Sequence, residues 1–165
     1  LQSTFGELVM RADDVKKFEL FKDLEEIEIK KLLQFAKVKQ YTRDEVIFLQ
    51  GDPGSGLFLI LRGVVEIYIE PGGNRVSLAK LKAGEFMGEM SLFGDGNQTR
   101  TASALSFEPV TAVMISTVDF KKLQTSGPKI LSKILLRLLM SLARRYDNLK
   151  SEFHSVREQI AGAQG

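Results

Sequence analysis

Cysteine is absent from this chain of 165 residues, and histidine occurs once, at His154. The lack of cysteine excludes disulfide bonds, thiolate metal sites and a cysteine nucleophile, and it is compatible with a reducing compartment. One imidazole and scattered carboxylates do not make a convincing metal cluster. We therefore expect no metal, no bound cofactor and no enzymatic activity, and we interpret His154 as a solvated helix residue.

Long apolar runs are also lacking. The best candidate, "ILLRLLM", is interrupted by Arg137 and falls short of the roughly 18 apolar residues that suggest a membrane-spanning helix. The start of the sequence has no secretory signal. These features predict a cytoplasmic protein without a membrane span.

The overall composition is that of a globular protein, with 44% hydrophobic and 27% charged residues. The length suits one compact domain with a helical extension. The net charge is only +2, but residues 119–150 contain eight Lys or Arg and two Asp. This region could attract an anion or a nucleic acid. We favour a solvated helix face, because no aromatic residues interleave with the cations as a stacking platform requires.

Short strand-like segments fill the middle of the chain, from Val38 to about Ile115. They are rich in β-branched and aromatic residues, and turn residues such as "GDPGSG", Arg62-Gly63 and "PGGN" separate them. We expect strands over residues 45–50, 56–62, 63–70, 75–81, 100–106 and 110–116. Many short, closely spaced strands predict a sandwich or a jelly-roll barrel.

Helices are expected on both sides of these strands. Residues 23–36 have apolar positions at helical spacing, and Asp23 and Glu26 have the spacing of a capping box. Ser116 and Asp119 can cap a short helix over residues 118–124. Gly127-Pro128 then ends that helix and begins a last one, over about 129–160.

The last helix carries an unbroken apolar seam at alternating spacings of four and three residues. Its members are Leu135, Leu139, Leu142, Tyr146, Leu149, Phe153, Val156 and Ile160. Such a heptad pattern is typical of a coiled coil. A helix of about 30 residues is about 45 Å long, longer than a small barrel. We therefore expect a homodimer through this helix; the alternative is a stripe that folds back onto further parts of a longer protein.

The stretch "GEMSLFGDGNQTRTAS" places Glu89 and Arg100 on either side of a loop. The two residues could form a salt bridge and nothing more. However, Glu89 follows a strand and begins what resembles a one-turn helix, whose Met90 and Ser91 N–H groups favour an anion. Arg100 begins the next strand and can reach the same anion through its guanidinium fork. A ligand with a phosphate for Arg100 and a hydroxyl for Glu89 would use both.

These residues resemble the cyclic nucleotide-binding domain family. The matching positions are Met87-Gly88-Glu89, Ser91-Leu92 and Arg100-Thr101-Ala102-Ser103, and the resemblance extends over about residues 20–160. It implies an α+β fold, with an antiparallel β-roll (a jelly roll of about eight strands) flanked by N-terminal helices and a long C-terminal helix. Residues 1–19 would be a helical lead-in, 20–126 the β-roll domain, 127–160 the hinge and dimerisation helix, and 161–165 a frayed tail. A second Phe5-Gly6-Glu7 motif lacks an Arg and strands around it, and we interpret it as coincidence.

The resemblance implies a role for each site residue. Glu89 would accept a hydrogen bond from the ribose 2′-hydroxyl, with the Gly88 backbone close to the sugar. Arg100 would pair with the cyclic phosphate. The backbone amides of Ser91 and Ala102, together with the Thr101 hydroxyl, would assist it. Ile67 and Leu81 would pack against the purine, and Met87 replaces the family's usual aromatic residue.

The function that follows is that of a sensor for cyclic AMP, favoured over cyclic GMP. Leu142, Arg145 or Leu149 would close over the ligand, and Leu92 and Phe93 would repack against the hinge near residues 120–123. The alternatives are a degenerate sensor that acts as a dimerisation scaffold without a ligand, and a regulator that binds another small anion. We expect the chain to be the sensor part of a longer protein, with no DNA-binding module in it.

Overall fold

The computed structural model describes residues 12–93 and 98–162. Two four-stranded antiparallel sheets form a β-roll, as predicted, with the strand orders β1-β8-β3-β6 and β2-β7-β4-β5. The first sheet contains β1 (Ala36–Tyr41), β3 (Gly56–Arg62), β6 (Phe86–Met87) and β8 (Val110–Ser116). The second contains β2 (Val46–Phe48), β4 (Val64–Ile69), β5 (Val76–Lys82) and β7 (Ser103–Ser106). The Phe5-Gly6-Glu7 motif, residues 94–97 and the end of the predicted tail lie outside the described residues.

Strand β3 separates two hydrophobic cores. Its sequence "GLFLILR" is apolar at consecutive positions, which is typical of a strand buried on both faces. Leu57, Leu59 and Leu61 belong to the core under the helices, whereas Phe58 and Ile60 belong to the core inside the β-roll. This alternation follows from the two-residue period of a strand. The helices therefore pack on the outside of the first sheet, and the interior of the roll faces the second.

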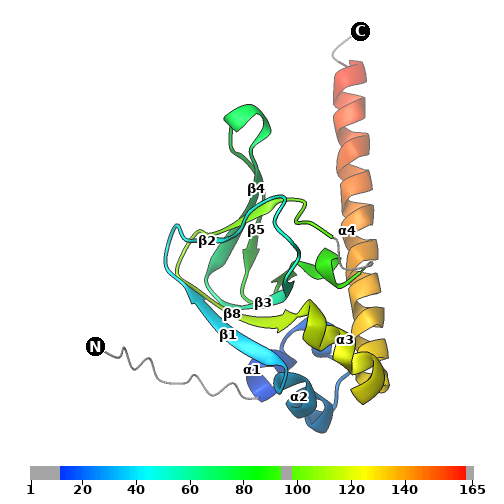
Figure 1. Ribbon diagram of the computed structural model, residues 1–165. Coiled ribbons are helices and arrows are strands. Elements are labelled where there is room, and N and C mark those ends of the chain that lie inside the picture. The colour runs from blue at the N-terminus through cyan, green and yellow to red at the C-terminus, as the bar shows by residue number, and fades with distance from the viewer. Residues whose placement is uncertain (1–11, 94–97, 163–165) are drawn as a thin grey trace, which may run out of the picture.

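The helical layer lies at one end of the roll (Figure 1). It consists of α1 (Ala12–Lys16), the 3-10 helix η1 (Glu19–Phe21), α2 (Glu26–Leu33) and α3 (Thr117–Ser126), together with the first part of α4 (Pro128–Gly162). Two further 3-10 turns, η2 (Pro71–Gly73) and η3 (Glu89–Leu92), interrupt the strands.

Two details of the predicted helix over residues 23–36 were wrong. The capping box is formed by Glu25 and Glu28, not by Asp23 and Glu26. The helix ends at Leu33, and Ala36 already pairs with Ile115 in the first sheet. Pairing with β8 satisfies the backbone of this segment, and this tertiary contact overrides its helical pattern.

Helix α4 is attached to the rest of the domain along its first three turns. Ile130, Ile134 and Leu138 are buried in the core under the helices. Arg137 forms a bidentate ion pair with Asp23, with both N–O distances at 2.6 Å, and Arg137 also pairs with Glu19. These hydrogen bonds from Arg137 lower the pKa of Asp23. Lys133 pairs with Glu28 at 2.6 Å.

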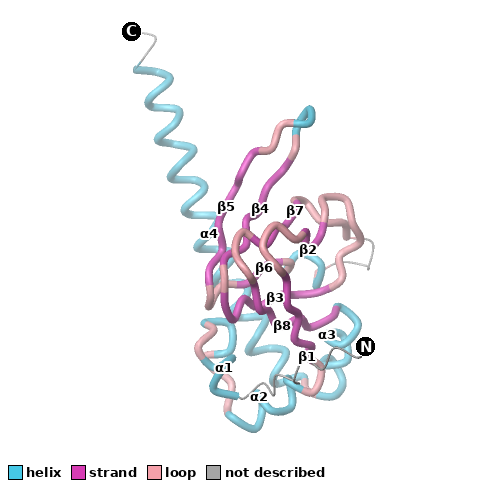
Figure 2. Tube along the Cα trace, turned by 90° about the vertical axis from the view of Figure 1, so that its left-hand side faces the viewer, coloured by secondary structure: helices cyan, strands magenta, loops and turns pink. Residues whose placement is uncertain are grey.

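The outer half of α4 stands clear of the sheets (Figures 1 and 2). From Leu139 onward most of the seam is exposed, and Leu149 and Phe153 keep 63% and 61% of their surface accessible. Among the described residues, no helix combines the length and the apolar character needed to cross a membrane.

Candidate functional site

A cavity of about 360 Å³ opens between the second sheet, η3 and α4. Residues from six segments line it: Phe48, Ile67, Ala79, Leu81, Phe86, Met87, Gly88, Glu89, Met90, Ser91, Thr99, Arg100, Thr101, Ala102 and Arg145. All ten site residues proposed from the sequence are in this set. Its volume is within the range of small-molecule sites, and a few polar groups are set in a largely apolar wall. The roles of these residues toward a ligand remain expectations.

Arg100 is the main cation of the cavity, and it is 94% buried, with 6% of its surface exposed. Its Nη2 donates to the Ser55 hydroxyl and to the Gly56 carbonyl, both at 3.1 Å. Its Nη1 donates to the Gly88 carbonyl at 3.3 Å. The guanidinium carbon lies 4.2 Å from the centre of the Phe48 ring. Its Nε is buried without a hydrogen-bond partner. Because an unpaired buried donor costs free energy, this position calls for an acceptor.

Burial lowers the pKa of Arg100, whereas the charges of Glu89 and Asp52 raise it. An Arg side chain stays protonated in proteins despite such a shift. The cavity therefore contains a permanent positive charge next to an unused donor, which suits an anion.

The loop "GDPGSG" holds Arg100 in place. Backbone hydrogen bonds connect Gly51 N to Arg100 O (2.8 Å), Arg100 N to Asp52 O (2.8 Å) and Gly54 N to Gln98 O (2.9 Å). The sequence interpretation treated this loop as a separator between strands. Its contacts show a second role, because it positions the cation and provides two acceptors for the guanidinium.

Gly88 turns the chain from β6 into η3 with a left-handed backbone, at φ 80°. A Cβ at this position would lie 2.5 Å from Arg100 Nη1 and 2.6 Å from the Gly56 carbonyl oxygen. Only glycine fits this close approach without a displacement. The Ser91 amide was predicted to be free for an anion, but it donates to the Gly88 carbonyl at 3.2 Å, as does the Ser91 hydroxyl at 2.7 Å. The short i→i+3 turn uses this amide internally.

Glu89 is buried, and its ion pair is with Arg145 of α4 rather than with Arg100. Arg145 Nη1 lies 3.0 Å from Glu89 Oε1, and Arg145 Nη2 donates to the Phe86 carbonyl at 3.2 Å. The guanidinium carbon is 4.7 Å from the centre of the Phe86 ring. Of the three residues considered for the lid, Arg145 lines the cavity, whereas Leu149 is exposed.

The wall of the cavity is apolar. Ile67 on β4 and Ala79 on β5 are paired across the sheet, and Leu81 lies two residues further along β5. The sequence interpretation missed Ala79, although the two-residue period of a strand puts it on the same face as Leu81. Phe48 and Phe86 were also missed, because no spacing rule relates them to Glu89 or Arg100. Among residues 12–93 and 98–162, no group of three metal-ligating side chains comes together.

Comparisons with known proteins agree with this geometry. The family model for the cyclic nucleotide-binding domain matches residues 38–126. The cyclic AMP receptor protein of Thermus thermophilus is 32% identical over 148 residues, which cover 87% of this chain and 67% of that protein. A cAMP-dependent protein kinase regulatory subunit of Colletotrichum orbiculare is 27% identical over 123 residues, 74% of this chain and 30% of that protein. These descriptions name a binding domain, a receptor and a regulatory subunit, and none of them indicates an enzyme.

A solved cyclic nucleotide-binding domain from Methylobacillus flagellatus KT superposes with a TM-score of 0.73 at 32% identity and covers 83% of this chain and 76% of that one. The matched family model covers more than half of the sequence, including the ten site residues predicted from it. The chain therefore belongs to the cyclic nucleotide-binding domain family.

Proposed function

We propose that this chain is a sensor that binds cyclic AMP in preference to cyclic GMP and transmits binding through α4. The observation that carries the proposal is the buried Arg100, which lines the cavity and whose Nε has no hydrogen-bond partner. A cyclic phosphate supplies the missing acceptor and neutralises the charge. Glu89, on the same cavity, supplies a carboxylate for the ribose hydroxyl.

The preference for cyclic AMP is supported by the apolar wall of Ile67, Ala79 and Leu81 and by the relatives, whose names refer to cyclic AMP. A scaffold without a ligand is less well supported. Such a protein has no need to bury a guanidinium with an unused donor, since this arrangement destabilises the empty fold. Mass spectrometry of ligands that co-purify with the protein distinguishes cyclic AMP, cyclic GMP, another anion and no ligand.

The proposed transmission begins at Glu89. The Glu89 carboxylate pairs with Arg145 of α4. A ribose hydroxyl that donates to this carboxylate therefore binds the same group that α4 contacts. The ligand therefore changes the relative stability of two α4 positions, which is a population shift. Leu92 of η3, Phe120 and Leu123 of α3 and the first part of α4 share one core, which supports a packed route between site and helix.

Calorimetry with cyclic AMP and cyclic GMP tests the proposal directly. We expect micromolar or tighter binding of cyclic AMP, and Arg100→Ala should weaken it by roughly tenfold to 100-fold, the value of one charge-assisted contact. Arg75→Ala is the matched control, since Arg75 is on the β4–β5 hairpin, over Tyr68 and outside the cavity. Absence of heat with both nucleotides, or equal affinity of Arg100→Ala and the unaltered protein, would refute the proposal.

We also propose that the exposed seam of α4 binds a second copy of this chain. Tyr146, Leu149, Phe153, Val156 and Ile160 are all exposed on α4, beyond the part that packs on its own domain. Their heptad spacing fits a two-stranded coil. Sedimentation should show a dimer that becomes a monomer in Leu149→Asp/Phe153→Asp. Ser151→Asp, on the opposite face of the helix, should remain a dimer.

The cytoplasm remains the proposed location.

A further inference from the structure

Thr117, the first residue of α3, lies where three segments meet. Its amide donates to the Ser55 carbonyl at 3.1 Å. Its hydroxyl oxygen lies 3.4 Å from the Gly54 carbonyl and 3.4 Å from the Ser91 carbonyl. Gly54 also approaches Ser91 so closely that a Cβ at Gly54 would overlap the Cβ of Ser91. The loop that holds Arg100, the turn η3 and the start of α3 therefore share one contact point.

The Thr117 hydroxyl has one hydrogen, so it donates fully to one of the two carbonyls at a time. Both acceptors belong to segments of the proposed phosphate site. Gly54 adjoins Ser55, whose hydroxyl accepts from Arg100, and Ser91 lines the cavity. A small displacement of η3 relative to the loop changes which carbonyl is nearer. Two nearly equal acceptors on separate segments therefore allow the Thr117 hydroxyl two alternative hydrogen bonds.

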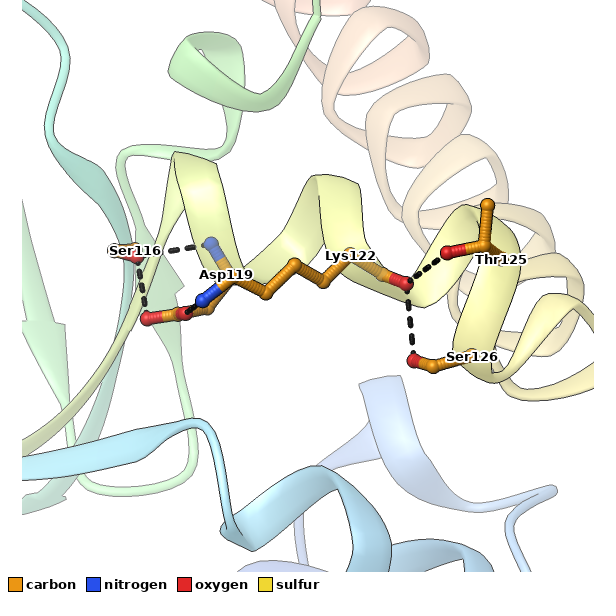
Figure 3. A network of polar contacts seen from close by, with 5 residues as sticks. All are labelled: Ser116, Asp119, Lys122, Thr125 and Ser126. Atoms are coloured by element: carbon orange, nitrogen blue, oxygen red, sulfur yellow. Dashed lines mark hydrogen bonds and ion pairs between the residues drawn. The ribbon is translucent and has the colours of Figure 1, made fainter.

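Helix α3 can transmit a displacement of its first turn because internal polar contacts hold both of its ends (Figure 3). At the N-terminus, the Ser116 hydroxyl accepts from the Asp119 amide at 3.0 Å, and Asp119 pairs with Lys122 at 2.7 Å. At the C-terminus, the hydroxyls of Thr125 and Ser126 donate to the Lys122 carbonyl at 3.2 and 2.9 Å. These contacts stabilise both ends of the helix.

We propose that the Thr117 hydroxyl is a positioning contact that couples the phosphate site to α3, by exchange between the Gly54 and Ser91 carbonyls. This inference rests on the proposed function. Thr117 is outside the set of residues that line the cavity. Its role is therefore to transmit the state of the site and not to hold the nucleotide.

Hydrogen exchange with and without cyclic AMP tests the coupling in three variants. Thr117→Val keeps the branched shape without the hydroxyl, Thr117→Ser keeps the hydroxyl, and Thr125→Val removes a hydroxyl at the far end of the same helix. In the unaltered protein, we expect cyclic AMP to slow the exchange of amides both in residues 88–92 and in 117–126. In Thr117→Val, the slowing in 88–92 should persist, and that in 117–126 should fall by about threefold or more, as expected for one hydrogen bond.

Thr117→Ser and Thr125→Val should behave like the unaltered protein. If Thr117→Val does not fold, as judged by circular dichroism, Thr117→Ala replaces it in the same comparison. Equal slowing in 117–126 for the unaltered protein and the variant without the hydroxyl overturns the inference and leaves the proposed function intact. Absence of any response to cyclic AMP in residues 88–92 of the unaltered protein overturns both.

Discussion

Substitution of Gly88 by Ala tests the close approach at the centre of the site. An Ala in the left-handed conformation of Gly88 costs about 1–2 kcal/mol. Its Cβ would also lie 2.6 Å from the Gly56 carbonyl oxygen, a backbone atom that cannot rotate away. A displacement of packed backbone costs about 1–3 kcal/mol more. We therefore expect Gly88→Ala to lower the free energy of unfolding by about 2–5 kcal/mol, measured by urea denaturation.

Gly73→Ala is the matched control, because Gly73 has nearly the same φ, 82°, but no atom within 4 Å of the added Cβ. The conformational cost, and the gain from a less flexible unfolded chain, are common to both variants. The difference between them, about 1–3 kcal/mol, therefore reports the steric contact.

The same substitution should also weaken cyclic AMP binding by roughly tenfold or more, because the new methyl group displaces the Arg100 guanidinium. Gly73→Ala should bind normally. Equal stability and equal affinity of the two variants would show that residues 56, 88 and 100 do not converge at the site.

Two further predictions concern how α4 is held. Leu138→Ala should lower the free energy of unfolding by about 2–5 kcal/mol, because Leu138 is fully buried, whereas Leu136→Ala, at an exposed position, should have little effect. Chemical denaturation of both variants measures this, and equal losses would contradict it. Asp23→Asn should destabilise the protein at neutral pH, because Arg137 lowers the pKa of Asp23. A carboxyl group whose pKa is lowered in the folded protein stabilises the fold at pH values above its ordinary pKa of 3.8. This stabilisation is lost as the pH falls through the pKa of the folded state. Urea midpoints of variant and unaltered protein should therefore converge in acid, and a constant difference would be the contrary result.

The fold was predictable because local signals and tertiary structure agree over most of the chain. Strand β3 coincides with the expected 56–62, and β8 with 110–116. The two strands that were not delimited lack such signals. Strand β1 has the sequence "AKVKQY", with half of its positions charged or polar, and β6 has two residues. Pairing with strands that are distant in the sequence determines the conformation of β1 and β6. No local sequence pattern predicts this pairing.

The members of the cavity were predictable where a motif or the family resemblance relates them. Gly88, Glu89 and Arg100 belong to one motif, and the resemblance to the family implied Ile67 and Leu81. The partner of Glu89 was not predictable to the same degree. Arg145 comes from α4, 56 positions away from Glu89. Sequence spacing did not distinguish Arg145 from Leu142 and Leu149 as the lid residue. The use of the Ser91 amide within η3 also depends on a turn geometry that composition does not specify.

The unequal attachment of α4 has a mechanical consequence. About 20 residues, from Leu142 to Gly162, extend beyond the buried contacts at Ile130, Ile134 and Leu138, and at 1.5 Å per residue they span about 30 Å. A rotation of about 10° at the base would carry the far end through about 5 Å, while atoms beside the pivot would move by a fraction of this. A spectroscopic distance probe at the C-terminal end of α4 would therefore be the most sensitive to small rearrangements around Glu89 and Arg145.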